Sequence, residues 1–223
     1  MTSAPARGPG GPESGTSRRI AAVLRDEILA GDLPPGTWLR QDELAARLGI
    51  SRIPLRDALR ILESDGLAES LPNRGSRVPT LSLEDVNTYY RMRERLEPLT
   101  LSESIPHLTG DDIAGLEQLQ DEIESSPDVN RFLALDRAFH MGTYSGCPSA
   151  QLLATTERLW NSTQHYRRAF MLLTSTDRAP IVNAEHRLIL DAVRRRDAED
   201  GERYLVGHIR RTRLELIAHP ELF

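Results

Sequence analysis

The chain has 223 residues, 39% of them hydrophobic, and a formal net charge of −5. This length and composition fit one small and one medium-sized globular domain and exclude a largely disordered chain. The single cysteine excludes an internal disulfide bond and a metal cluster built from thiolates. Because no run approaches the ~20 apolar residues of a membrane helix and the N-terminus lacks a signal-peptide pattern, we expect a cytoplasmic protein with no membrane partner.

Composition and charge divide the chain into segments. Residues 1–16 are dominated by Gly, Pro, Ser and Thr, so they are predicted to form a disordered tail. Residues 17–80 carry slightly more arginine than acid, whereas residues 81–223 are clearly acidic. Contact with a nucleic acid would therefore belong to residues 17–80.

Between Ser17 and Gly66 the sequence predicts three helices. Apolar residues at helical spacing define the first, which should end at Gly31. The second should cover residues 41–48, and Ser51 lies where its hydroxyl could cap the third. Two short helices joined by a three-residue turn are typical of a helix-turn-helix.

The run Leu67–Val78 follows the third helix and contains the turn-forming tetrapeptide Pro-Asn-Arg-Gly. It predicts two short strands around a tight loop, the wing of a winged helix-turn-helix. Arg74 would lie at the tip of this wing and reach a DNA groove or a phosphate, and Gly75 would let the backbone approach closely. We therefore predict that residues 17–80 form a winged helix-turn-helix DNA-binding domain.

The third predicted helix carries a row of arginines. Arg52, Arg56 and Arg60 recur every fourth residue, on a face separate from the apolar stripe. Arginines near the start of such a helix can donate two hydrogen bonds to a guanine edge, and later ones can bind phosphates. A merely solvated face would look the same for any one arginine. Together with the turn and the wing, the row predicts binding to double-stranded DNA.

From residue 81 to residue 223 only helical periodicity is found. About six helices are expected, with breaks near Thr109-Gly110, Ser126-Pro127, Gly146-Cys147-Pro148, Ser175-Thr176 and Arg196-Asp197. Short connections favour antiparallel neighbours, so this segment predicts an antiparallel all-α helical bundle. The predicted fold class is therefore mainly α, a winged helix-turn-helix followed by a helical bundle.

Asp136 and His140 are four residues apart and therefore lie on one face of their helix. Phe132 and Phe139 direct that face toward the bundle core. Burying a carboxylate beside an imidazole is costly unless the two share a proton or a cation. The pair therefore indicates either a hydrogen-bonded core pair or part of a metal site.

His186 lies in the apolar stripe of a later helix, and His208 follows 22 residues further on. Both are about equally distant from the predicted turn at Asp197, so they should face each other across a helical hairpin. With Asp136 and His140 they would offer one carboxylate and three imidazoles to a divalent cation such as Zn, Ni, Mn or Fe. A single buried histidine is more often an ordinary core residue, and the spacing of this set does not decide between the two interpretations.

The segment from Leu44 to Leu67 resembles the winged-helix signature of the GntR family of regulators. The matching residues are Ser51-Arg52, Pro54, Arg56 and Ala58-Leu59, and Pro72-Asn73-Arg74-Gly75 resembles the family's wing. The resemblance implies that Arg52 and Arg56 contact bases or phosphates and that a homodimer binds a pseudo-palindromic operator. Asp42 stands where some members of the family use an arginine to touch DNA, so that contact should be absent.

Residues 83–218 resemble the C-terminal ligand-binding domain of the FadR branch of this family, known as the FCD domain. The matching residues are Asp136, Phe139, His140, Glu185, His186, Ile189, Asp197 and His208. In that domain an aspartate and three histidines bind a metal ion. The resemblance therefore implies a divalent metal ion, with zinc as the first candidate, held by Asp136, His140, His186 and His208.

Four protein ligands would leave one or two coordination positions open, which suit the oxygens of a carboxylate or hydroxy acid. We therefore expect a small organic acid as the effector, bound within residues 81–223. Arg93 matches a recurrent arginine in the first helix of the family's effector domain and could bind the far end of the acid. An ion pair with Glu97, one helical turn later, is the alternative for Arg93.

These features together predict a DNA-binding transcription regulator, a repressor whose operator affinity falls when the acid binds. A metal-dependent enzyme is the main alternative, since an open metal position can activate water. The sequence offers no clear general base beyond the metal ligands, and an enzyme would not account for the arginine-rich helix and the wing. A regulator with a purely structural metal is the second alternative.

Overall fold

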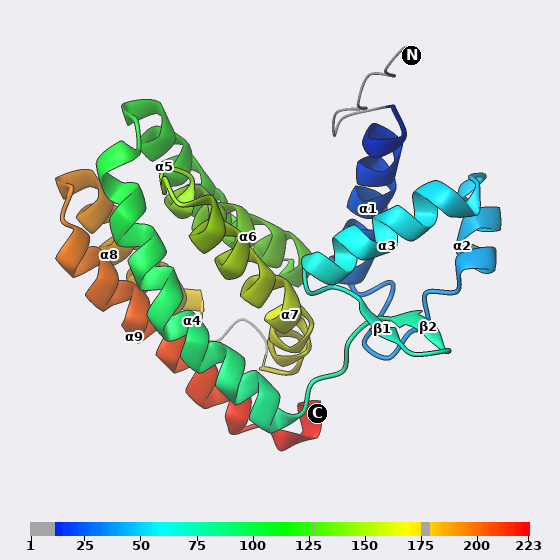
Figure 1. Ribbon diagram of the computed structural model, residues 1–223. Coiled ribbons are helices and arrows are strands. Elements are labelled where there is room, and N and C mark those ends of the chain that lie inside the picture. The colour runs from blue at the N-terminus through cyan, green and yellow to red at the C-terminus, as the bar shows by residue number, and fades with distance from the viewer. Residues whose placement is uncertain (1–11, 127, 175–178) are drawn as a thin grey trace, which may run out of the picture. The chain divides into compact units, whose positions relative to one another are not determined.

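The computed structural model describes residues 12–126, 128–174 and 179–223 (Figure 1). It divides into two compact units, one up to Thr80 and one from Leu81 to Phe223, and each has its own hydrophobic core. The described residues contain nine α-helices, two 3-10 helices and one two-stranded sheet, so the predicted mainly α fold class is confirmed. None of the described helices combines the length and the apolar character needed to cross a bilayer.

The first unit is a three-helix domain with a β-hairpin. Its elements are α1 (Pro12–Ala30), α2 (Gln41–Leu48), α3 (Arg52–Ser64), β1 (Glu69–Leu71) and β2 (Gly75–Arg77). The two strands pair antiparallel, with Ser70 opposite Ser76. Helices α2 and α3 with this hairpin form the winged helix-turn-helix that the sequence predicts.

Helix α1 begins earlier than predicted. It starts at Pro12, so residues 12–16 belong to a helix and were wrongly assigned to a disordered tail; the rest of that tail lies outside the described residues. The apolar stripe of α1 starts only at Ile20, so hydrophobic periodicity could not reveal the polar first turns. A proline also fits the first turn of a helix, where its missing N–H is not needed.

The turn between α2 and α3 consists of residues 49–51. Gly49 adopts the left-handed conformation (φ 65°), and its amide donates to the carbonyl of Ala46, which ends α2. Ser51 lies at the residue before α3, as predicted, but its side chain makes no capping hydrogen bond. The predicted hydroxyl cap is therefore wrong, and Ser51 is exposed at the start of the helix.

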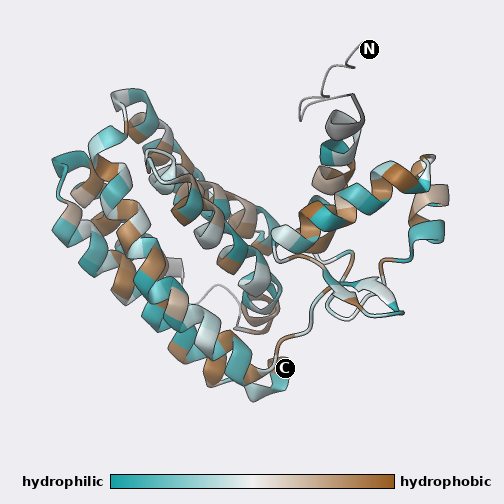
Figure 2. Ribbon diagram, in the orientation of Figure 1, coloured by the Kyte–Doolittle hydropathy of each residue, from teal (hydrophilic) through white to brown (hydrophobic). Residues whose placement is uncertain are grey.

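The core of the first unit lies between α1 and α3. Leu55, Ala58, Leu59 and Leu62 form the buried stripe of α3, and each such side chain contributes about 1.5–3 kcal/mol when fully buried, less for alanine. Figure 2 shows hydrophobic and hydrophilic residues alternating along α3, as expected for a helix with one buried face. Its arginines are therefore left on the outer side.

The second unit contains six α-helices within the described residues. They are α4 (Leu83–Ser104), α5 (Gly110–Ser125), α6 (Val129–Tyr144), α7 (Ala150–Thr174), α8 (Ala179–Arg195) and α9 (Ala198–Ile217), with the 3-10 helices η1 (Ile105–His107) and η3 (Pro220–Leu222). Helix α4 packs along α9 and α7, α5 packs against α6 and α8, and α8 packs against α9. The helix breaks agree with the predicted ones, except that Pro127 of one break and the whole of the break at Ser175-Thr176 lie outside the described residues.

Capping residues set where several of these helices begin. Ser82 and Asp85 form a reciprocal capping box at the start of α4, and Thr109 and Asp112 form another at the start of α5. The carboxylate of Asp197 accepts a hydrogen bond from the backbone at the start of α9. The α8–α9 hairpin therefore turns at the predicted place.

The turn that follows α6 is fixed to the C-terminal end of α4. The amide of Gly146 donates to Ser104 Oγ at 2.9 Å. A Cβ atom at position 146 would lie 2.6 Å from the Ser104 carbonyl oxygen, so only glycine fits without a backbone shift. This end of α4 is thus held firmly against the α6–α7 turn.

Candidate metal centre and DNA-binding surface

Three histidines from three helices of the second unit converge at one point. His140 of α6, His186 of α8 and His208 of α9 are buried, and one ligand nitrogen of each lies within 4.8 Å of the other two. Their ring centroids are 4.9 to 5.1 Å apart. The structure therefore brings together the three histidines that the sequence singled out, including the pair that faces across the α8–α9 hairpin.

Asp136 lies beside this cluster on α6. Its side chain is fully buried, and Oδ1 is 3.6 Å from His186 Nε2. Its other oxygen, Oδ2, accepts a hydrogen bond from Nη1 of Arg167, a buried residue of α7. The carboxylate therefore lies between the histidines and a guanidinium that the sequence analysis had not selected.

Arg167 had a detectable signal in the sequence. It lies seven residues after Trp160 and three before Phe170, on the buried side of α7. A charged residue within an apolar stripe is buried only when it has a partner. That rule could have marked Arg167, although the partner on another helix could not be named from α7 alone.

Each histidine is oriented by a hydrogen bond from its other ring nitrogen. His186 Nδ1 lies 2.8 Å from Gln120 Oε1, and His208 Nδ1 lies 3.0 Å from Glu185 Oε2. His140 Nδ1 lies 3.4 Å from the hydroxyl of Tyr144, which makes it the most weakly held of the three. A partner on Nδ1 leaves Nε2 for a metal, which is the usual pattern around histidine ligands.

The donor atoms of this cluster fit a metal ion. Asp136 Oδ1, His140 Nε2 and His186 Nε2 are buried without a hydrogen-bond partner among the described residues. A buried polar atom that lacks a partner costs about 1–3 kcal/mol, so three converging ones are unfavourable unless a cation satisfies them. One carboxylate oxygen with imidazole nitrogens is a suitable donor set for zinc and for similar divalent ions.

The protonation states also suit a cation. Burial lowers the pKa of His186 to about 3, with a further contribution from His208, and burial lowers the pKa of His208 to about 4. Burial likewise holds the pKa of His140 well below its usual value. Burial alone would raise the pKa of Asp136, but the charge and hydrogen bond of Arg167 outweigh it and hold that pKa well below its usual range. At neutral pH the cluster is therefore three neutral imidazoles and one carboxylate, the forms that bind metals.

Arg93 has its own partners in the core. Its Nε donates to Glu97, and its Nη1 donates to Thr163 Oγ1 at 3.0 Å. Its Cζ lies 4.6 Å from the ring centroid of Tyr90 and 4.3 Å from that of Trp160. The ion pair with Glu97, considered from the sequence as the alternative to effector binding, is thus what the structure contains.

Glu97 connects Arg93 to the histidine cluster. It is fully buried, and its Oε2 accepts hydrogen bonds from Tyr144 Oη at 2.7 Å and from Trp160 Nε1 at 2.9 Å. Because Tyr144 also lies next to His140, the polar network runs from the cluster to the arginine without a gap. Sequence spacing had identified Glu97 only as a partner of Arg93.

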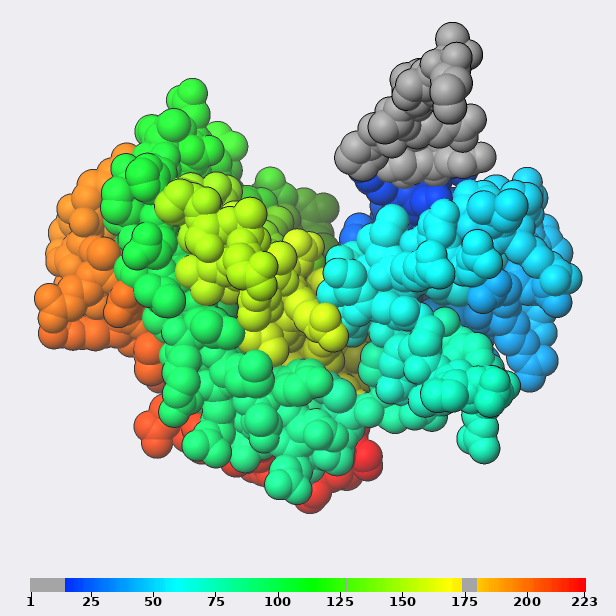
Figure 3. Space-filling model, viewed as in Figure 1, coloured from blue at the N-terminus to red at the C-terminus, as the bar shows by residue number. Residues whose placement is uncertain are grey.

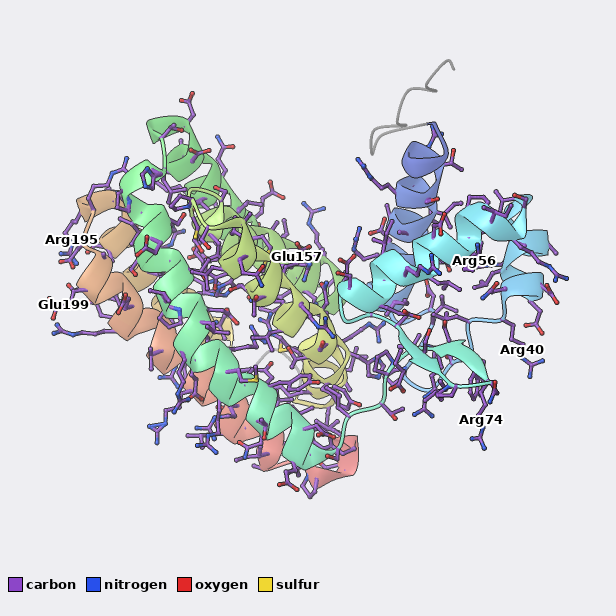
Figure 4. All side chains as sticks on the ribbon, viewed as in Figure 1. Arg40, Arg56, Arg74, Glu157, Arg195 and Glu199 are labelled. Atoms are coloured by element: carbon purple, nitrogen blue, oxygen red, sulfur yellow. The ribbon has the colours of Figure 1, made fainter. Side chains whose placement is uncertain are left out.

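The outer side of α3 and the tip of the wing carry exposed arginines in the first unit. Figure 4 shows Arg56 on α3 and Arg74 on the wing, and within the described residues neither forms an ion pair. Arg52 is different, because its Nε lies 2.7 Å from Asp42 Oδ1. Arg60 lies 3.6 Å from Asp57. Arg56 and Arg74 are therefore the more available cations of the set.

Other residues also shape this surface. Gly75 has a left-handed backbone (φ 89°), which explains glycine at the wing loop by conformation. Arg40, which the sequence analysis did not select, is exposed before α2, 3.2 Å from Glu43. Ile53 is 62% exposed beside Arg52, and a single exposed apolar side chain of this kind is common on protein surfaces.

Two family models match the chain. One, described as bacterial regulatory proteins of the gntR family, matches residues 16–78, and the other, the FCD domain, matches residues 88–211. This chain belongs to the GntR family. The two matches of this GntR-family regulator correspond to the winged helix-turn-helix and to the helical bundle with the histidine cluster.

Individual relatives agree with this assignment. The GntR-family regulator is 31% identical over 202 residues to a probable D-xylose utilization operon transcriptional repressor of Paenarthrobacter nicotinovorans, covering 87% of each chain. A solved GntR-family regulator of Pseudomonas syringae is 30% identical, with a TM-score of 0.56 and coverage of 95% of this chain and 90% of that one. Escherichia coli McbR is 22% identical with a TM-score of 0.81, covering 92% of this chain and 98% of its own, and shows the shared fold.

Family membership decides between the broad classes of function. The protein is a DNA-binding transcription regulator and not an enzyme. The metal-dependent enzyme considered from the sequence is thereby set aside. The role of the histidine cluster in the GntR-family regulator is the remaining question.

Proposed function

We propose that the protein is a homodimeric repressor whose operator binding weakens when a small carboxylate or hydroxy acid binds at a divalent metal ion. The ligands of the ion would be Asp136, His140, His186 and His208. The observation that carries this proposal is the convergence of buried, unpartnered ligand atoms in the second unit. The repressor role is supported by the names of relatives, among them the D-xylose operon protein and the E. coli repressor RspR, which is 28% identical.

The bound ion would supply open coordination positions to acid oxygens, with zinc as the first candidate and Ni, Mn or Fe as others. The charges around the histidine cluster support an acid as the companion of the ion. Arg93 is paired with Glu97, and Arg167 with Asp136, while the imidazoles are neutral. Since the protein's own charges already balance, a divalent cation bound there would add net positive charge, which the carboxylate of an acid would partly offset.

In the first unit we propose a DNA-contacting surface on α3 and the wing. Its residues would be Ser51, Arg52, Arg56, Arg60, Arg74 and Gly75. With α3 in the major groove, the wing can reach an adjacent groove or phosphate. Two such units on a two-fold axis read two half-sites, so the operator should be a pseudo-palindrome of double-stranded DNA. Such a regulator acts in the cytoplasm, where bacterial DNA lies.

An apolar stripe on α4 supports association of two copies. Helix α4 lies on the surface of the second unit in Figure 3. Met92 and Leu99, 41% and 44% exposed, lie seven residues apart on this helix and so on one face. A second copy of the chain would cover this stripe.

For regulation, acid binding must change the structure at the start of the second unit, which directly follows the first unit in the chain. The backbone N–H of Leu81 donates to the hydroxyl of Tyr166 at 2.6 Å. The next residue of α7 is Arg167, which contacts Asp136. A rearrangement of α7 at the metal centre is therefore one residue away from the bond that holds the start of the second unit, and it can favour one state of the dimer over another.

Tyr166→Phe should uncouple sensing from DNA release. Loss of one hydrogen bond removes about 0.5–1.5 kcal/mol, so the acid should still bind while its effect on operator affinity falls about two- to tenfold. Calorimetry measures the first quantity and fluorescence anisotropy of labelled operator DNA the second. Tyr204→Phe is the matched control, because the Tyr204 hydroxyl has no hydrogen bond within the described residues. An unchanged acid response in Tyr166→Phe contradicts this route.

The proposed function is tested by metal analysis and by gel shift with operator fragments selected from genomic DNA by the protein itself. The purified protein should contain about one divalent ion per chain, and a series of small carboxylates and hydroxy acids should include one that weakens DNA binding. Treatment with a chelator should abolish the acid effect. A protein that takes up no metal contradicts the proposal, and an acid that strengthens DNA binding reverses its sign.

A further inference from the structure

We propose that Arg167 and Tyr90 form the carboxylate-binding subsite of the effector pocket, and that Arg93 does not serve as the carboxylate clamp. This inference rests on the proposed acid sensing and assigns it to particular side chains. Two observations carry the inference. Of the two buried guanidiniums, that of Arg167 has more N–H donors left for a ligand, and the buried hydroxyl of Tyr90 has no partner among the described residues.

Arg93 is fully engaged. Its guanidinium donates to Glu97 and to Thr163 and lies over the rings of Tyr90 and Trp160. Releasing it would leave the fully buried carboxylate of Glu97 without its cation. Arg93 therefore acts as a fixed part of the core beside the histidine cluster.

Arg167 is engaged at one nitrogen only. Among the described residues its single hydrogen bond runs from Nη1 to Asp136, although a guanidinium has five N–H donors. Its Cζ lies 5.4 Å from the ring centroid of Trp160 and 5.9 Å from that of Phe132. Through Asp136 it is next to the histidine cluster, so an anion at the cluster would meet the unused donors of this guanidinium.

Tyr90 supplies the neutral part of the subsite. Its side chain is 1% exposed, and its hydroxyl has no hydrogen-bond partner within the described part of the chain. Burial raises its pKa, and the charges of Arg93, Arg167, Glu97 and Asp136 all act on it. The hydroxyl is therefore a protonated donor on a ring that contacts Arg93, and a buried donor without a partner needs an acceptor. A carboxylate has two oxygens, enough to accept from Arg167 and from Tyr90 at once.

The test compares wild type with Arg167→Gln, which keeps a donor for Asp136 but removes the charge, and Tyr90→Phe, which removes only the hydroxyl. Acetate is the probe, titrated into the zinc-loaded dimer by isothermal calorimetry, with acetamide as the uncharged comparison. Acetate affinity should fall about 10- to 100-fold in Arg167→Gln and about 2- to 10-fold in Tyr90→Phe. Tyr204→Phe should match wild type, and acetamide should bind far more weakly than acetate throughout.

A second measurement separates this inference from the proposed function. Zinc affinity, measured with a competing chelating dye in the absence of any acid, should be unchanged in Tyr90→Phe and no weaker in Arg167→Gln. A wild type that binds no zinc, or a zinc-loaded wild type that binds no acetate, contradicts the proposed function itself. If wild type binds both zinc and acetate, and Tyr90→Phe and Arg167→Gln each bind acetate as tightly as wild type, the subsite alone is overturned. If Arg167→Gln loses zinc, Arg167 only positions Asp136 and its assignment to the subsite is overturned.

Discussion

His186→Ala is expected to lower zinc affinity by more than about a hundredfold and to abolish the acid response. Loss of an outer-sphere partner already costs about 10- to 100-fold at such sites, and His186 is a fully buried member of the cluster with an unpartnered Nε2. Without metal, this variant should also unfold at a lower temperature than metal-free wild type, because it removes a fully buried ring that stacks on Phe139 and whose Nδ1 lies 2.8 Å from Gln120 Oε1. Zinc titration and thermal unfolding with and without chelator measure both effects.

The matched variant for this prediction is Gln120→Leu, which removes the acceptor on His186 Nδ1 and keeps the imidazole. It should weaken zinc binding by the smaller factor of about 10 to 100. If His186→Ala lowers the melting temperature strongly but preserves the acid response, the metal is structural, and sensing at the metal centre is wrong.

Arg56→Ala is expected to weaken operator binding by about 1–3 kcal/mol, a factor of about 5 to 150. Arg56 is exposed on the outer side of α3 and has no ion pair within the described residues, so its full charge is available to DNA. Fluorescence anisotropy at several salt concentrations distinguishes the two kinds of contact. A base contact loses selectivity at one position, whereas a phosphate contact weakens all sequences and lowers the salt slope by about one.

Arg52→Ala provides an internal comparison for Arg56→Ala. Arg52 must exchange Asp42 for DNA, so its removal should cost less than that of Arg56. Arg203→Ala, at an exposed arginine of the second unit, should leave DNA binding unchanged. Equal operator affinity in wild type and Arg56→Ala contradicts the assigned orientation of α3.

The sequence predicted the fold closely because the signals it relies on are local. Capping residues such as Ser82 and Thr109 determine where helices start, and residues such as Gly146 determine where they break. The first turns of α1 escaped because they contain no apolar residue to set a period. The hydroxyl cap expected at Ser51 failed because capping preference is statistical, whereas the hydrogen bond depends on the side-chain rotamer.

The sequence predicted those parts of the site that depend on the geometry of a single helix or of one helical hairpin. Residues four apart on α6 and the symmetric distances of His186 and His208 from one turn follow from helix geometry. Arg167 and Gln120, on α7 and α5, were not found because their contacts with Asp136 and His186 depend on packing between helices that are distant in the chain. The partner of Arg93 was predicted as an alternative since Glu97 lies one turn away on the same helix.

The hydrogen bond between Gly146 and Ser104 fixes the C-terminal end of α4. At its far end the chain is held by the Leu81–Tyr166 hydrogen bond. A helix of 22 residues is about 33 Å long at 1.5 Å per residue. A rotation of α4 by about 5° about Ser104 would displace its opposite end by roughly 3 Å. Small adjustments around a bound acid would in this way be magnified where the second unit begins.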